Sequence, residues 1–105
     1  MTFEIEHTDN ALREIANTYL WIKQRGERTA SRWREELIRK IESLAVQPEK
    51  HRLAPENPRF TKAIGQLQFR KRRSQFRVLY TIEGRRVVIL SFRHHSRQPL
   101  SGDEF

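Results

Sequence analysis

Arginines and histidines gather at the end of the last apolar segment of the chain, in the stretch ILSFRHHSRQPL at residues 89–100. A guanidinium group can hold a phosphate through paired hydrogen bonds and can stabilise charge that develops at phosphorus. A histidine beside such groups titrates near neutral pH, so it can accept or donate a proton. Together these residue types could cleave RNA without a metal ion, because the ribose 2′-hydroxyl supplies the nucleophile.

The strands that carry these side chains decide whether they share a site. Three strands are predicted at about residues 64–71, 75–82 and 86–94, and their short connections make them an antiparallel meander. A three-residue turn at 83–85 would build an apolar face from Phe76, Val78, Tyr80, Val88, Leu90 and Phe92. The opposite, open face would then carry Arg77, Leu79, Ser91, Arg93 and His95, within reach of Arg70 and Arg97. A two-residue turn is disfavoured, because it would bury Arg77 unpaired beside Val88 and Leu90.

A simpler interpretation of the same residues is a docking patch. Arginines on an open sheet face and a histidine at a strand end more often bind a polyanion or face solvent than catalyse a reaction. His94 falls on the apolar side, and neighbouring strand residues point to opposite faces, so His94 and His95 cannot share a metal ion. With no cysteine and no cluster of acidic residues, we expect neither a metal site nor a cofactor.

The N-terminal half predicts a strand and two helices that would cover the sheet. Residues 2–6, TFEIE, alternate as in a short strand, and Thr8 or Asp9 can cap a helix that ends near Gly26. Its apolar stripe comprises Leu12, Ile15, Ala16, Tyr19 and Ile22. A second helix, from about residue 29 to residue 46, carries Ala30, Trp33, Leu37, Ile41 and Leu44 on one face. The short link makes an antiparallel hairpin, and we expect Trp21 to pack between its helices, with anchoring of a partner as the alternative.

The composition limits the classes of protein to which this sequence can belong. The 105 residues suit one domain spanning 1–105, and the absence of cysteine excludes disulfide and thiol chemistry, as suits a reducing cytoplasm. No apolar run is long enough to span a membrane. The formal net charge is +8, and nine of the 21 Lys and Arg residues but one of the 13 acidic residues lie between Arg70 and Arg97. This concentration of charge predicts a polyanionic partner, either nucleic acid or an acidic protein segment.

The stretch QFRVLYTIEGRRVVILSFRHHSR, together with the order of the elements, resembles the RelE/ParE superfamily of toxins from bacterial type II toxin–antitoxin modules. The resemblance covers nearly the whole chain. It implies an α+β fold in which an N-terminal strand and an antiparallel helical hairpin pack with a largely antiparallel sheet of about four strands. It also implies a cytoplasmic toxin that inhibits bacterial growth, and a cognate antitoxin whose flexible acidic or amphipathic segment neutralises it.

The resemblance to the RNA-cleaving members suggests roles for individual residues. Arg77, in FRVLY, matches the arginine that contacts substrate phosphate, and His95 falls where one branch has its catalytic histidine. The catalytic set implied is His95, Arg77, Arg97 and Glu56, and the RNA-binding set is Arg70, Arg72, Arg73 and Arg93. The chain departs from the pattern in two places: the tail lacks the catalytic tyrosine, and a second basic position on the LQFR strand is Gln68.

The helical part resembles the other branch. TASRWREELIRKIESLAVQP is similar to the longer hairpin of ParE-type toxins, which inhibit DNA gyrase and do not cut RNA. The sequence therefore leaves two targets, mRNA on the ribosome and DNA gyrase. The first would make the chain a metal-independent endoribonuclease. A non-toxic basic nucleic-acid-binding module is the alternative from a different class. It is disfavoured because the phenylalanines on the strands are needed in the core and are not free to stack on bases.

Overall fold

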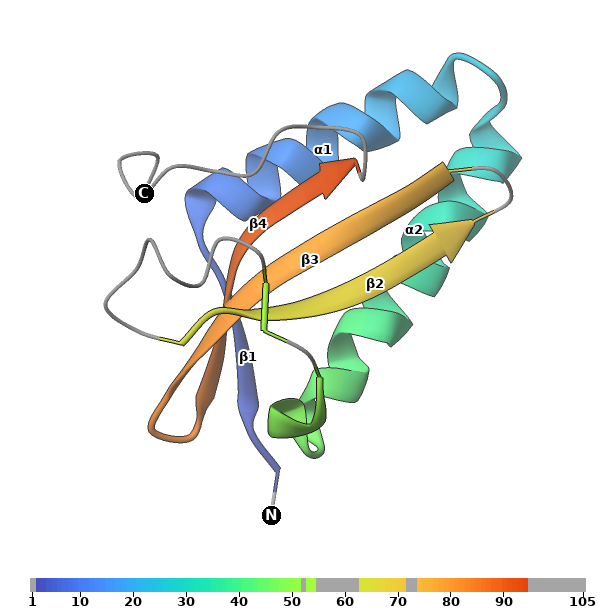
Figure 1. Ribbon diagram of the computed structural model, residues 1–105. Coiled ribbons are helices and arrows are strands. Elements are labelled where there is room, and N and C mark those ends of the chain that lie inside the picture. Colours follow the sequence, from blue (N-terminus) through green and yellow to red (C-terminus); the bar gives the residue numbers. More distant parts are fainter. Residues whose placement is uncertain (1, 52, 55–62, 72–73, 95–105) are drawn as a thin grey trace.

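Two helices and a four-stranded sheet form the protein in the computed structural model (Figure 1), which describes residues 2–51, 53–54, 63–71 and 74–94. In chain order the elements are β1 (Glu4–His7), α1 (Asp9–Lys23), α2 (Glu27–Glu42), β2 (Gly65–Lys71), β3 (Ser74–Glu83) and β4 (Arg86–His94). Two short 3-10 turns, Ser43–Ala45 and Pro48–Lys50, follow α2. The α+β class predicted from the sequence is confirmed. In the described part of the chain neither α-helix has the length and apolar character that a membrane crossing requires.

The strands are ordered β1-β4-β3-β2 across the sheet. The predicted meander of β2, β3 and β4 is antiparallel, and β1 pairs with β4 in parallel. Both helices lie on the same side of this sheet (Figure 1), so the apolar face of α2 and one face of the strands enclose the core. The predicted apolar face is confirmed, since all five of its residues are buried: Ala30, Trp33, Leu37, Ile41 and Leu44. The predicted end near residue 46 is too late, because α2 ends at Glu42 and Leu44 lies in the 3-10 turn that follows.

The predicted stripe of α1 is confirmed in part. Ile15, Tyr19 and Ile22 pack in or against the core, whereas Leu12 and Ala16 are exposed and Ala11 is buried instead. Trp21 is 51% exposed, so the expectation that it packs between the helices is wrong. The reason is that α1 contacts both α2 and the edge of β4. These two neighbours draw Ala11 into the core in place of Leu12 and leave Trp21 outside it.

Thr8 fixes the point where β1 gives way to α1. Its side-chain oxygen accepts a hydrogen bond from the amide of Ala11 (3.1 Å) and donates to the carbonyl of Ile89 (3.0 Å), so it caps the helix and ties it to β4. The helix ends at Lys23. Gly26 has a φ of 150° and precedes the first residue of α2, so it serves as the joint of the hairpin and not as the residue that ends α1.

The N-terminal half of α1 closes the edge of β4 where β1 stops. Because β1 pairs only with residues 86–89, the next residues of β4 would otherwise present open backbone groups. Asn10 donates to the carbonyl of Leu90 (3.1 Å). The Glu14 carboxylate accepts hydrogen bonds from the hydroxyl of Ser91 (2.7 Å) and the amide of Phe92 (3.3 Å). The side chains of Asn10 and Glu14 therefore take the place of a neighbouring strand.

Replacing Glu14 with alanine is expected to lower the free energy of unfolding by about 1 to 2 kcal/mol, because Ser91 and Phe92 lose their side-chain acceptor at a partly closed edge. Urea unfolding followed by circular dichroism measures the change. Glu35→Ala is the matched control, since Glu35 is exposed on α2. Equal stability of the two variants would mean that Glu14 does not hold the edge.

The β3–β4 hairpin corrects the predicted register. Glu83 pairs with Arg86, so the turn has two residues, Gly84 and Arg85, and not three. The register then shifts between Leu79 and Tyr80, which leaves Leu90 as an extra residue in β4. Val87 and Ile89 consequently join the main core, whereas Leu90 packs against a smaller cluster of Ala54, Ile64 and Leu79. The bulge also removes the objection to a two-residue turn, because Arg77 pairs with Arg93 instead of lying beside Val88.

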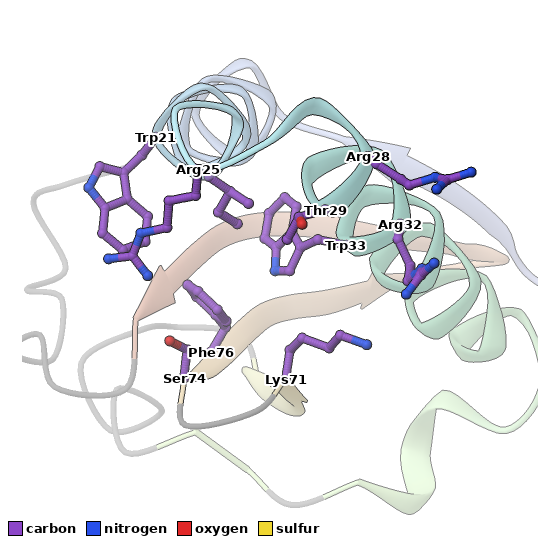
Figure 2. A pocket seen from close by; sticks show the side chains of 10 residues that line it. Trp21, Arg25, Arg28, Thr29, Arg32, Trp33, Lys71, Ser74 and Phe76 are labelled. Carbon is purple, nitrogen blue, oxygen red and sulfur yellow. The ribbon is translucent and has the colours of Figure 1, made fainter.

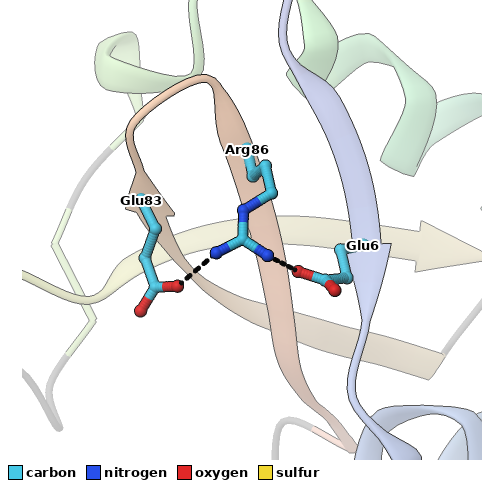
Figure 3. A network of polar contacts seen from close by, with 3 residues as sticks. All are labelled: Glu6, Glu83 and Arg86. Atoms are coloured by element: carbon cyan, nitrogen blue, oxygen red, sulfur yellow. Dashed lines mark hydrogen bonds and ion pairs between the residues drawn. The ribbon is translucent and has the colours of Figure 1, made fainter.

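Arg86 joins three strands near the β3–β4 turn (Figure 3). Its guanidinium donates to Glu6 of β1 (2.7 Å) and to Glu83 of β3 (3.1 Å). All three side chains are partly exposed, so these ion pairs contribute less than about 1 kcal/mol each. The two carboxylates offset the charge of Arg86 within the basic stretch that the sequence predicts.

Candidate functional site

The face of the sheet opposite the helices carries the arginines singled out from the sequence. We call it the second face, and its described polar residues on the three long strands include Gln66, Gln68, Arg70, Arg77 and Arg93. Strand alternation puts Arg70, Arg77 and Arg93 on this face together, as predicted. Glu56, Arg72, Arg73, His95 and Arg97 lie outside the described residues, so the proton-transfer group of the predicted site does too.

Burial of two of these arginines corrects the prediction of an open face. Arg77 and Arg93 are direct cross-strand partners and are only 4% and 6% exposed. One guanidinium nitrogen of Arg77 donates to the side-chain oxygen of Gln66 (3.1 Å). Buried guanidinium groups need such acceptors, because an uncompensated charge inside a protein is costly. Arg77 therefore serves as part of the packed structure, and Arg70 is the exposed arginine among the three.

His94 lies on the helix side of the sheet, as the alternation predicts. It pairs with Phe76, and the two rings meet edge to face with their centroids 5.3 Å apart. His94 is exposed. Among the described residues, no group of three or more His, Asp or Glu side chains is placed to hold a metal ion.

A basic and aromatic pocket lies at the end of the helical hairpin where α1 connects to α2, and we call it the tip pocket (Figure 2). It has a volume of about 480 Å³, and its lining residues are Trp21, Ile22, Arg25, Arg28, Thr29, Arg32, Trp33, Lys71, Ser74 and Phe76. Sequence reasoning missed it. The available signal was the pairing at helical spacing of Trp21 with Arg25 and of Arg28 with Arg32, which puts each pair on one side of its helix.

A second pocket of about 470 Å³ lies beside the 3-10 turn at Pro48–Lys50 and includes His51 and Tyr80. The Tyr80 hydroxyl donates to the carbonyl of Pro48 (2.6 Å), and burial, with a smaller effect of Glu49, raises the pKa of Tyr80 to about 12. The His51 ring meets the Tyr80 ring edge to face, and its Nε2 is buried without a hydrogen-bond partner in the described part of the chain. Burial lowers the pKa of His51 from its ordinary value, and the neighbouring lysines lower it further.

Stability is expected to fall as the pH drops from about 7.5 to about 5.5. Burial lowers the pKa values of both His51 and His7, so the folded protein binds these protons more weakly than the unfolded chain does. The stabilisation is complete above the ordinary histidine pKa of about 6.5 and is lost as the pH falls below it. Urea midpoints across this range measure the effect. His51→Gln and His7→Gln should each flatten the curve; a curve unchanged in the double variant would contradict the prediction.

Comparisons with known proteins agree with the fold. The family model described as the ParE toxin of the type II toxin–antitoxin system, parDE, matches residues 5–99. A search of curated proteins finds no match. A chain of the solved structure titled as the chromosomal ParDE TA system from P. aeruginosa is similar in fold, with a TM-score of 0.68 at 13% identity over 89% of this chain and 96% of that one. Since the family model covers most of the sequence, this chain belongs to the ParE toxin family of type II toxin–antitoxin systems.

Proposed function

We propose that this chain is a growth-inhibiting toxin that acts on DNA gyrase and is neutralised by an antitoxin with an acidic, flexible segment. Membership of the ParE family supports the toxin role, and the resemblance of the hairpin to ParE-type toxins supports gyrase as the target. The net charge of +8 favours an acidic segment in the neutralising partner. The solved ParDE system from P. aeruginosa, whose title names a TA system, is consistent with such a pairing.

Burial of Arg77 is the observation that favours gyrase inhibition over RNA cleavage. In the ribonuclease interpretation the Arg77 guanidinium must contact a substrate phosphate. Its side chain is 4% exposed and hydrogen-bonded to Gln66, so a phosphate could reach it only after the second face rearranged. Electrostatic catalysis depends on donors that already point at the reacting group, because reorganisation lowers their contribution. Inhibition of a protein target makes no such demand on Arg77.

Two assays on the purified chain test this proposal. The first adds it to gyrase, ATP and relaxed plasmid and measures supercoiling on a gel, with plasmid relaxation by topoisomerase I as the control for target. The second adds it to a cell-free translation reaction and maps the 5′ ends of the message by primer extension. We expect the chain to abolish supercoiling by gyrase, to leave plasmid relaxation by topoisomerase I unchanged, and to produce no new 5′ ends in the message.

The other outcomes are equally informative. New 5′ ends inside translated codons, with supercoiling intact, would replace gyrase by ribosome-bound mRNA as the target. Expression of the chain without an antitoxin should arrest bacterial growth. Normal growth at high expression would remove the toxin role and favour a non-toxic binding module.

A further inference from the structure

We propose that the tip pocket binds an acidic, amphipathic peptide segment, which places an apolar side chain against Trp33 and Phe76 and its carboxylates against the arginines of the rim. The inference deepens the proposed function and rests on it for the partner's role, because the segment would belong to the neutralising protein. The chemistry of the pocket itself comes from four features of the described residues: its apolar floor, a buried indole donor, its basic rim and an aromatic ring already covered.

The floor of the pocket is apolar and rigid. Ile22, Trp33 and Phe76 are buried and come from α1, α2 and β3, so three separate elements converge there. The Trp33 and Phe76 rings meet edge to face with centroids 5.9 Å apart. A site that is built on packed helices and a strand offers a preformed surface for an apolar side chain, which lowers the entropic cost of binding.

Trp33 also brings an unused hydrogen-bond donor to the pocket. Its side chain is 3% exposed, and the indole nitrogen is buried with no hydrogen-bond partner among the residues that the structure describes. Figure 2 draws this nitrogen on the side of the ring nearer to the β2–β3 turn, where Lys71 and Ser74 also line the pocket. A buried donor without an acceptor costs about 1 to 3 kcal/mol. A ligand oxygen that accepted this hydrogen bond, once the side chains covering the nitrogen had moved, would therefore recover part of that energy. Both a peptide carbonyl and a carboxylate provide such an oxygen.

The rim of the pocket is strongly basic. Arg25, Arg28, Arg32 and Lys71 all line it. Lys71 is paired with Glu36 of α2 at 2.8 Å, whereas Arg28 and Arg32 make no hydrogen bond or ion pair with other residues that the structure describes. The pair Arg28 and Arg32 lies one helical turn apart, which matches carboxylates one turn apart on a helical partner. The rim therefore complements an acidic segment.

A peptide suits this pocket better than a nucleic acid does. Single-stranded nucleic acids bind through bases that stack on exposed aromatic faces. Trp21 is the exposed aromatic residue here, and the Arg25 guanidinium already lies over its ring, 4.4 Å from the centroid. The remaining aromatic surface is the buried floor, which has room for a side chain within about 480 Å³. Nucleic acid is accordingly the competing outcome of the test.

The two tryptophans of the chain both line the pocket, so intrinsic fluorescence reports on it directly. The probe is a short synthetic peptide of alternating Leu and Glu pairs that contains no tryptophan, and a second peptide has Gln in place of every Glu. We expect the acidic peptide to change the tryptophan emission of the full-length chain saturably. The double variant R28E/R32E should weaken this binding by at least about tenfold, since it reverses two rim charges.

R34E/R39E is the matched control, because Arg34 and Arg39 are exposed on the same helix but do not line the pocket. It should bind the acidic peptide as the unaltered chain does. The proposal is overturned if the emission does not respond, if the Gln peptide binds equally well, if both double variants lose binding alike, or if an oligothymidine binds more tightly than the peptide. The proposed function is tested separately, by expressing the unaltered chain in bacteria without any peptide. It fails if growth continues.

Discussion

Replacing Trp33 with alanine is expected to lower the free energy of unfolding by about 4 kcal/mol, enough to unfold much of the population of a small domain. Trp33 is 3% exposed and is the point where α2 meets three strands. Its ring packs edge to face against Phe69, Phe76 and Phe92, with centroids 6.2, 5.9 and 5.7 Å away. Alanine would leave a cavity among these rings, and the loss of contacts adds to the loss of buried apolar area.

Trp21→Ala is the matched control for this experiment. The same atoms are removed at a side chain that is 51% exposed, so the expected loss is about 1 kcal/mol or less. Chemical unfolding followed by circular dichroism compares the two variants, because tryptophan fluorescence changes with the substitutions themselves. Similar losses for the two variants would mean that Trp33 does not hold α2 on the sheet.

Replacing Gly65 with alanine is expected to cost about 3 kcal/mol. Gly65 pairs with Tyr80 across β2 and β3, and a Cβ atom there would lie 2.5 Å from Cζ of the Tyr80 ring and 2.8 Å from its hydroxyl. The ring cannot easily move aside, since Tyr80 is buried and its hydroxyl is hydrogen-bonded to the carbonyl of Pro48. The substitution would therefore push apart the two strands or detach the segment after α2.

Gly84→Ala separates this clash from the general cost of removing a glycine. Gly84 has a φ of 60°, and nothing lies within 4 Å of the Cβ position, so only backbone strain of about 1 kcal/mol is expected. Thermal unfolding of the two variants gives the comparison. A Gly65 variant as stable as the Gly84 variant would show that the Tyr80 ring can move aside.

Local patterns in the sequence determined the elements of this protein. The four buried apolar residues of α2 recur at helical spacing, Thr8 provides a capping oxygen, and the last three strands begin and end within about a residue of the predicted limits. Such features depend on neighbours within a turn of helix or along a strand, so they can be read without the rest of the fold. The resemblance to the RelE/ParE superfamily extended this to the class of the fold and to the family.

Only the tertiary structure decided the register of β4 and the exposure of the arginines. VVIL is apolar at every position, so the sequence does not show which of its residues face the helices and which face the other side of the sheet. The bulge at Leu90 lets Val87, Ile89 and Phe92 all face the helices, a set that regular alternation cannot bury together. The same pairing sets Arg77 against Arg93 in a buried position, where the sequence suggested an open basic surface. The tip pocket likewise required α1, α2 and the meander to meet, because its walls come from residues that lie up to 55 positions apart, from Trp21 to Phe76. Burial and proximity of this kind arise from packing between distant segments, and local periodicity does not record them.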